Sequence, residues 1–287
     1  MPRVRIVTDS TAHFRDSGYA EQNGVIVVPL TIHFGKQAYR EGHEIDAHTY
    51  YQRLAAGGPL ASAASPSPEA FLSLYEELSR SGEPVLSIHL SSKLSHTWHN
   101  AKAAADTLLG RCQVTVIDSL TTSVGLGLLV EAAAQASARG ESLDEIVRIV
   151  RGMIPRLYVV FFVESLEYLE HSRRLGKAQA RLGAMLGIKP FMTIEEGEIV
   201  PMEKVRTRQQ AVEKLMEFIT EFSSIEHLAI LHGAANHADE TRQLLERLAL
   251  DFPGREWEVA TYGPSLATQI GPDSLGVIVF EGQEEAG

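Results

Sequence analysis

A run of hydroxyl and imidazole side chains over residues 91–97 is the part of this sequence richest in groups that could bind a ligand. It stands between an apolar run typical of a strand and a helical pattern that extends to Leu109. A serine at a helix start satisfies backbone N–H groups that lack a partner within the helix, so at least one of these serines should be a cap. The other hydroxyls and free N–H groups could bind an anion at the helix N-terminus.

Two carboxylates stand directly after predicted strands. Asp9 follows the first strand and Asp118 follows the one that ends at Ile117. At the carboxyl end of a strand such residues often face a crevice, although each could equally cap a turn. One interpretation is therefore a small hydrolase or phosphotransferase that uses Asp9, Asp118 or His96. It predicts an open polar cleft with a carboxylate or imidazole near Ser95.

Several cofactor and catalytic motifs are missing from the sequence. His96 and His99 are three residues apart, but no carboxylate or cysteine stands at ligand spacing beside them, which disfavours a metal site. Gly125-Leu126-Gly127 lacks the third glycine of a dinucleotide fingerprint, and neither a P-loop nor a G-x-S-x-G elbow is present. The single cysteine, Cys112, excludes an internal disulfide and is expected to be a buried, inert thiol. We expect no cofactor.

Short apolar runs alternate with amphipathic helical patterns along the whole chain. This alternation predicts an α/β fold in which helices cover a mostly parallel sheet. Glu195, Glu196 and Gly197 separate two of the runs and predict a hairpin turn. The predicted strands span residues 4–8, 25–30, 84–89, 114–117, 158–163, 188–194, 198–205, 228–231, 257–261 and 275–280.

Length and charge narrow the class of protein. A chain of 287 residues with 44% hydrophobic residues predicts two domains with sizeable cores. Pro155 lies between a predicted helix and a predicted strand, which suggests domains at residues 1–154 and 155–287. A net charge of −11 disfavours binding to nucleic acid or to an anionic membrane. No apolar run reaches the ~20 residues of a membrane span, so we expect no membrane insertion and a cytoplasmic location.

The order of short motifs along residues 3–281 resembles the DegV family. The opening Val7-Thr8-Asp9-Ser10-Thr11-Ala12 is similar to the family's V-T-D-S-T-A, and residues 86–95 are similar to its S-I-H-L-S-S-x-L-S-G-T run. Further matches are Val28-Pro29-Leu30, Tyr39-Arg40-Glu41-Gly42, Pro66-Ser67-Pro68, Val116-Ile117-Asp118-Ser119, Leu166-Glu167-Tyr168-Leu169, Ile188-Lys189-Pro190 and Val205-Arg206-Thr207-Arg208.

The resemblance implies a two-domain, DegV-like α/β fold. The first domain would have a mostly parallel sheet flanked by helices, the second would be another α/β domain, and a lipid tunnel would lie between them. Members of the family bind a long-chain fatty acid such as palmitate, and in some bacteria they present its carboxylate to a separate fatty acid kinase. By this resemblance the protein is a monomeric, non-catalytic carrier whose partners are a fatty acid and a fatty acid kinase.

The resemblance also assigns residues to the fatty acid head group. The family's head-group serine falls on Ser95, which is retained, and the glycine after it is His96 here. The threonine of the family's T-S-Q-P-S-P falls on Ala63, so its hydroxyl is missing, and Ser62 and Ser65 are the adjacent substitutes.

Three more positions follow from the same comparison. The histidine of a C-terminal motif has become Gln269, which can donate a neutral hydrogen bond but cannot carry charge. Arg206 falls on an arginine linked in the family to the kinase-facing surface or the head-group region. The family's G-G-R corresponds to Ser172-Arg173-Arg174.

Two rivals to the carrier interpretation are kept open. One is the hydrolase or phosphotransferase described above. The other is a regulatory interaction module with an incidental lipid, which predicts that emptying the tunnel leaves partner binding unchanged.

Overall fold

The computed structural model describes residues 3–57, 59–172, 189–233 and 238–282. The chain forms two compact units, the first made of residues 1–46, 63–155 and 196–198 and the second of residues 47–62, 156–195 and 199–287. The boundary predicted after residue 154 lies one residue from the change between Pro155 and Arg156. The sequence did not predict that residues 47–62 group with the second half, and the division into domains stays a prediction.

The first unit contains a four-stranded sheet in the order β2-β1-β6-β7. All three pairings in it are parallel. Parallel strands run in one direction, so the residues that follow them gather at one edge of the sheet. The strands are β2 (Ile26–Val28), β1 (Arg5–Asp9), β6 (Val85–His89) and β7 (Val114–Asp118).

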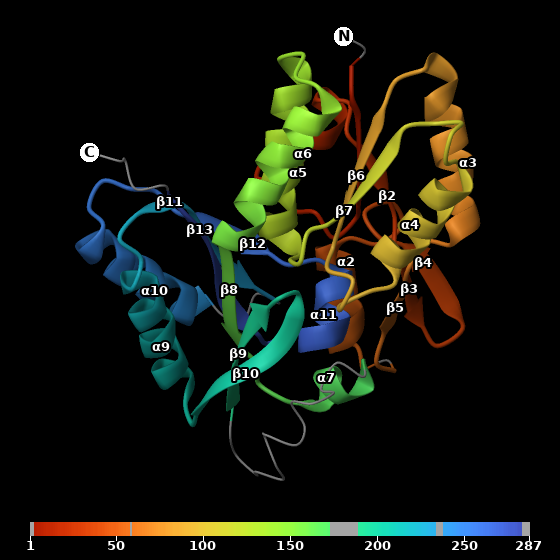
Figure 1. The fold of residues 1–287 in the computed structure, drawn as a ribbon. Helices are drawn as coiled ribbons and strands as arrows, with labels where there is room; N and C mark the ends of the chain where they lie inside the picture. The colour runs from red at the N-terminus through yellow and green to blue at the C-terminus, as the bar shows by residue number, and fades with distance from the viewer. Residues whose placement is uncertain (1–2, 58, 173–188, 234–237, 283–287) are drawn as a thin grey trace, which may run out of the picture. The chain divides into compact units, whose positions relative to one another are not determined.

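Helices cover both faces of this sheet. Figure 1 shows α5 (Ser123–Ala138) and α6 (Leu143–Met153) on one side, and α3 (Pro68–Leu78) and α4 (Thr97–Thr107) on the other. The face toward α3 and α4 buries one apolar cluster. It contains Val7 and Val85 from the sheet, Phe71 and Tyr75 from α3, and Ala101, Ala104 and Ala105 from α4. The mostly parallel, helix-flanked sheet predicted from the sequence is confirmed.

Shorter elements complete the first unit. A second sheet has the order β4-β3-β5, with β3 (Thr31–Phe34), β4 (Gln37–Arg40) and β5 (Ser62–Ala64). The others are α1 (Tyr19–Gln22) and the 3₁₀ turns η1 (Ser79–Ser81) and η2 (Ile154–Arg156). Cys112, expected to be buried, is half-buried and packs at the margin of the apolar cluster.

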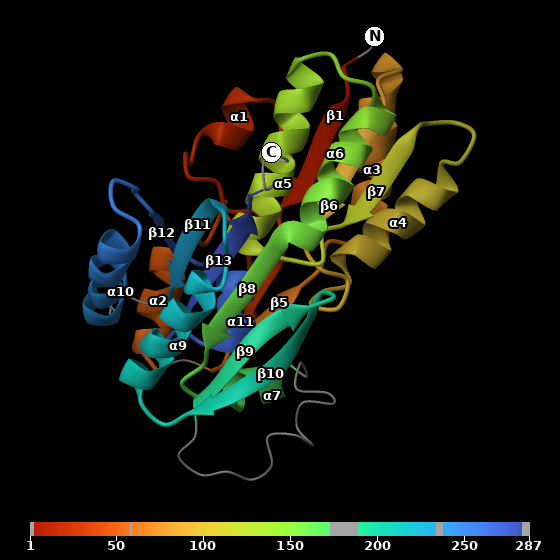
Figure 2. The same cartoon turned by 60° about the vertical axis from the view of Figure 1, so that its left-hand side comes forward.

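The second unit is built on a six-stranded mixed sheet in the order β10-β9-β8-β13-β11-β12. Figures 1 and 2 show α9 and α10 together on one face, where they bury a continuous apolar core with β8, β11 and β13. Its elements are α2 (Ala47–Ala55), β8 (Leu157–Phe162), α7 (Glu167–His171), β9 (Lys189–Glu195), β10 (Glu198–Val205), α9 (Arg208–Thr220), β11 (Ile225–His232), α10 (Ala238–Asp251), β12 (Glu258–Thr261), α11 (Pro264–Ile270) and β13 (Leu275–Glu281).

The hairpin predicted between β9 and β10 is present. Its two loop residues, Glu196 and Gly197, have φ angles of +47° and +81°. Positive φ at both loop positions is typical of a type I′ turn, whose twist matches that of the flanking strands. Glycine adopts this conformation readily, which explains why Gly197 marks the turn in the sequence.

Candidate functional site

Polar side chains gather at the carboxyl edge of the parallel sheet in the first unit. Asp9 ends β1, His89 ends β6 and Asp118 ends β7. The side chains of Asp9 and His89 are both fully buried, whereas Asp118 is half-buried. A buried carboxylate needs several hydrogen bonds to offset the loss of its hydration, so its partners reveal what it does.

Four donors surround the Asp9 carboxylate. The backbone N–H and the hydroxyl of Thr11 donate to Oδ1 at 3.1 and 2.6 Å. The backbone N–H of Leu90 and Nδ1 of His89 reach Oδ2, each at 3.0 Å. These bonds occupy both oxygens and join the chain after β1 to the chain after β6. Asp9 therefore acts here as a clamp on two loops, and no face of it is open to a substrate.

A chain of hydrogen bonds fixes the tautomer of His89. The hydroxyl of Tyr75 donates to Ser87 Oγ at 2.8 Å, and Ser87 Oγ lies 2.7 Å from Nε2 of His89. Burial raises the pKa of Tyr75, so its phenol stays neutral and remains the first donor. In the neutral imidazole, Ser87 then donates to Nε2, and the ring proton stands on Nδ1, where it faces Asp9.

The hydrogen-bonded series Ser87, His89 and Asp9 has the order of a hydrolase triad, but a substrate cannot reach it. Ser87, the residue in the nucleophile's place, has no exposed surface, and the ring of Phe71 packs edge-on against His89 with centroids 5.1 Å apart. A nucleophile must reach a substrate carbonyl, which this buried hydroxyl does not. Asp9 and His89 therefore have a structural role, which is to join the segments that follow β1 and β6.

Asp118 makes a second clamp. Its Oδ1 accepts the backbone N–H groups of Ser92 and Leu120, each at 3.1 Å. The Ser91 N–H donates to the Thr121 carbonyl at 2.8 Å, which ties the same two loops together again. The loop after β6 is thus held on one side by Asp9 and on the other by Asp118.

This doubly fixed loop carries Ser95. The Ser91 carbonyl accepts the N–H groups of Leu94 and Ser95 at 3.0 and 3.1 Å, so the loop closes into a tight turn before α4. The Ser95 side chain accepts the Thr97 N–H at 3.2 Å, whereas the N-cap residue of α4 is His96, which makes no side-chain capping hydrogen bond. Ser95 itself is 7% exposed.

Two more hydroxyls surround Ser95. Its Oγ lies 2.8 Å from Ser65 Oγ and 2.8 Å from Thr97 Oγ1. The structure therefore brings together Ser95, which the sequence singled out, and Ser65, one of the two substitutes considered for the missing threonine. Thr97 was part of the polar run but was not selected as a site residue.

The remaining first-unit positions are less enclosed. Ala63 is half-buried in β5. His96 is exposed, and its ring lies 5.9 Å from the ring of His99. Within the described residues no group of three or more histidine, cysteine, aspartate or glutamate side chains could hold a metal ion.

Three predicted residues group with the second unit. Ser62 is exposed in β5. Arg206 is exposed directly after β10, where its backbone N–H donates to the side chain of Gln210 at 2.9 Å. Gln269 is 7% exposed in α11. Arg173 and Arg174 lie outside the described residues.

Gln269 is held by a helix that is fixed at both ends. The Tyr262 hydroxyl donates to the Gly271 carbonyl at 2.6 Å, and Tyr51 donates to the Tyr262 carbonyl at 3.0 Å. Gly271 has a φ of +85°, and the ring of Tyr168 packs against its α-carbon. The position of Gln269 therefore depends on the buried Tyr51 and Tyr262, which lie outside the motifs found in the sequence.

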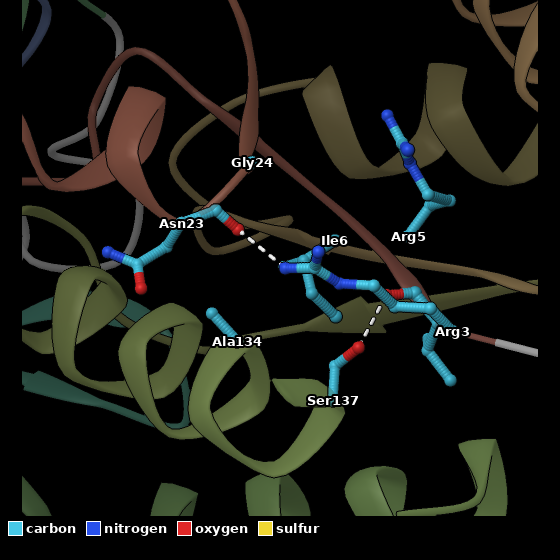
Figure 3. A pocket seen from close by; sticks show the side chains of 8 residues that line it. Arg3, Arg5, Ile6, Asn23, Gly24, Ala134 and Ser137 are labelled. Carbon is cyan, nitrogen blue, oxygen red and sulfur yellow. Dashed lines mark hydrogen bonds between the residues drawn. The ribbon is translucent and has the colours of Figure 1, made fainter. Parts of the chain in front are cut away.

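A small cavity lies at the opposite, amino end of β1 (Figure 3). Its volume is about 30 Å³, which is room for one or two water molecules. Arg3 donates to the Asn23 carbonyl across it, Ser137 donates to the Val4 carbonyl, and the Arg5 side chain turns away. The cavity is too small for an acyl chain, and it is distant along β1 from the polar edge.

Comparisons with known proteins agree with this fold. The model of the DegV family, described as "Uncharacterised protein, DegV family", matches residues 3–282. Protein DegV of Bacillus subtilis is 32% identical over 278 residues, which cover 96% of this chain and 98% of that protein. No helix among the described residues is long and apolar enough to cross a membrane.

Two solved structures are similar over nearly the whole chain. One is a DegV-family protein from Thermus thermophilus, described for its fatty acid binding, with 31% identity, a TM-score of 0.85, and coverage of 97% of this chain and 99% of that one. The other is DegV of Bacillus subtilis, described as a fatty acid binding protein, with 30% identity, a TM-score of 0.86, and coverage of 98% and 100%.

Proposed function

Since this chain belongs to the DegV family, we propose that it is a carrier that binds a long-chain fatty acid, such as palmitate, in a buried apolar tunnel. The hydroxyl cluster of Ser65, Ser95 and Thr97 holds the carboxylate, and the head group is presented to a separate fatty acid kinase. The carrier acts as a monomer in the cytoplasm, where ATP for such a kinase is available. It performs no reaction of its own.

The similarity to two relatives described as fatty-acid-binding carries this proposal, because it extends over nearly the full length of the chain. The geometry at Ser95 supports it. A head-group site needs a hydroxyl that is held in place by the protein, and the clamps of Asp9 and Asp118 hold this loop through its backbone N–H groups.

The two parts of the ligand contribute differently. Burial of each methylene contributes ~0.8 kcal/mol, so the roughly fourteen methylenes of palmitate supply most of the gross binding free energy. A hydrogen bond to a charged group contributes about 1.5–3 kcal/mol, which is small beside the tail but directional. The tail therefore sets the affinity, and the hydroxyl cluster at Ser95 sets which atom the kinase meets.

A non-catalytic role accounts for the acidic residues as well. Asp9 is saturated by four donors, and Oδ1 of Asp118 accepts two backbone N–H groups. A general base must have a lone pair within reach of a substrate proton. The arrangement supports a positioning role for both carboxylates.

Mass spectrometry of ligand extracted from the purified, denatured protein tests the proposal. We expect one free long-chain fatty acid per chain. A stoichiometric acyl lipid with another head group would contradict the assignment of the carboxylate. An empty protein that also takes up neither palmitate nor oleate would contradict the carrier function.

Presentation to a kinase needs its own experiment. With a fatty acid kinase and ATP, Arg206→Ala should lower the rate of acyl phosphate formation and leave the Kd for palmitate unchanged, because Arg206 is exposed. Arg247→Ala, on the exposed side of α10, is the matched control and should change neither quantity. Equal rates for both variants would contradict the role of Arg206.

A further inference from the structure

We propose that Ser65 is the residue that donates the hydrogen bond to the head group, and that Ser95 acts on the ligand only through it. This inference rests on the proposed function. It concerns a residue whose hydroxyl lies 2.8 Å from Ser95 Oγ and which stands two positions after Ala63.

The count of protons in the hydroxyl cluster supports this assignment. A hydroxyl has one proton to donate and two lone pairs. The Thr97 N–H occupies one lone pair of Ser95 Oγ. The two other bonds of Ser95, to Ser65 and to Thr97 Oγ1, must then use its proton and its second lone pair.

The hydroxyl groups of Ser65, Ser95 and Thr97 therefore form a series in which every hydrogen bond is donated in the same direction. If Ser65 donates to Ser95 and Ser95 to Thr97, the unused proton belongs to Thr97. If Thr97 donates to Ser95 and Ser95 to Ser65, the unused proton belongs to Ser65. In either order a single proton is left for a ligand, and it is never that of Ser95.

Burial decides between the two orders. Thr97 has no exposed surface, and among the described residues Ser95 is its hydroxyl's partner. A leftover proton there would be a buried donor without an acceptor, which is costly. Ser65 is half-buried, so its proton can be directed to a ligand or to water. The order from Thr97 through Ser95 to Ser65 is favoured.

The backbone explains why Ser65, and not Ser62, takes this place. Side chains two positions apart on an extended strand share a face, and neighbouring ones point to opposite faces. Ser65 directly follows β5 and so continues the face of Ala63, whereas Ser62 lies on the other face and is exposed. The hydroxyl missing at position 63 is regained two residues later.

Neutral hydroxyl donation also defines the ligand class. Ser65 can bond any acceptor oxygen, but a carboxylate forms the stronger, charge-assisted bond. We expect Ser65→Ala to weaken palmitate binding to delipidated protein roughly tenfold, measured by displacement of a fluorescent fatty acid. Binding of hexadecane, which has no head group, should not change.

Three variants complete the test. Ser73→Ala, at an exposed serine of α3, is the control and should bind palmitate like the wild type. Ser65→Ala combined with Ala63→Thr should recover most of the lost affinity, because a hydroxyl returns to the same face. Ser65→Ala combined with Ser95→Ala should be no weaker than Ser65→Ala alone, because both act through one proton.

The outcomes separate this inference from the proposed function. If the wild type binds palmitate and Ser65→Ala binds it equally well, Ser65 is not the donor and the carrier function stands. Additive losses in the double variant would show that Ser95 contacts the ligand independently, which also overturns the inference. A wild type that binds no fatty acid would overturn both proposals.

Discussion

Asp9 and His89 lie on neighbouring parallel strands, and their side chains meet at 3.0 Å with neither one exposed to solvent. The bond connects the ends of β1 and β6 below the loop that carries Ser95. Because Tyr75 and Ser87 fix the imidazole from the other side, the pair has one orientation. Two strands of the sheet are thus held in register by side chains that have no exposed surface.

Substitutions at His89 should distinguish the effect of its contact with Asp9 from that of its contact with Ser87. The amide of asparagine can replace Nδ1 as a donor to Asp9, whereas that of glutamine reaches toward Ser87 and leaves Asp9 short of a donor. We expect His89→Gln to lower the free energy of unfolding by about 3 kcal/mol, and His89→Asn by clearly less. Urea unfolding monitored by circular dichroism measures both. Equal losses would contradict the role of the bond to Asp9.

The clamp at Asp118 predicts a local effect on dynamics. Asp118→Ala removes the acceptor of the Ser92 and Leu120 N–H groups, while Asp118→Asn keeps an acceptor oxygen. Hydrogen exchange at these two amides should accelerate at least tenfold in the alanine variant and much less in the asparagine variant. Unchanged exchange at both amides in Asp118→Ala would show that the loop is held without this carboxylate.

Buried tyrosines predict a loss of stability in alkaline solution. Burial raises the pKa of Tyr75, Tyr262 and Tyr51 above the ordinary tyrosine value of about 10. The unfolded chain releases these protons near pH 10 while the folded chain retains them. Their contribution is therefore complete below pH 10 and declines as the pH rises toward the folded-state pKa, by about 1.4 kcal/mol per pH unit for each tyrosine.

Chemical unfolding at pH 8, 10 and 11 measures this decline. Tyr75→Phe should be less stable than the wild type at pH 8, because Ser87 loses its donor, but should lose less stability between pH 10 and pH 11. Subtracting the two curves removes the contribution of lysines, which titrate in the same range. Parallel curves would mean that Tyr75 is not a titrating group in unfolding.

The strands of the two larger sheets could be predicted from the sequence, but the short strands β4 and β5 and part of the assembly could not. The run of apolar residues predicted the strand that ends at Asp9, and turn-forming residues predicted the turn at Glu196 and Gly197. Both are signals within a few neighbouring residues. The grouping of residues 47–62 with the second unit has no local signal, because it depends on tertiary contacts.

The candidate site shows the same division. Ser95 could be selected because it stands in a recognisable motif before a helix. The partnership of His89 with Asp9 joins residues 80 positions apart, and that of Tyr75 with Ser87 joins a helix to a strand, so neither is visible in a short motif. Ser65 could have been preferred to Ser62 from the alternation of a strand, but only once β5 was known to be extended.

Gly271 predicts a clear cost for a single methyl group. Its φ is +85°, and an added Cβ would lie 2.8 Å from Cδ2 of Tyr168. Gly254 has a similar φ of +78°, but a Cβ there meets no atom within 4 Å. Gly254→Ala should lose about 1 kcal/mol of stability from backbone strain alone, and Gly271→Ala about 2–3 kcal/mol because strain and contact add. Equal losses would show that the Tyr168 ring moves aside freely.

Gln269→His tests whether the neutral side chain of α11 limits the proposed head-group site. Gln269 is only 7% exposed, and α11 is fixed at both ends, so a histidine would have little freedom to turn to solvent. A histidine titrates near pH 6.5, and its cationic form makes a charge-assisted bond roughly twice as strong as that of an amide. The Kd for palmitate should therefore fall about tenfold at pH 6 and much less at pH 8, while hexadecanol binding changes little at either pH. A gain that is equal at both pH values, or equal for the alcohol, would mean that the histidine improves packing without reaching the carboxylate.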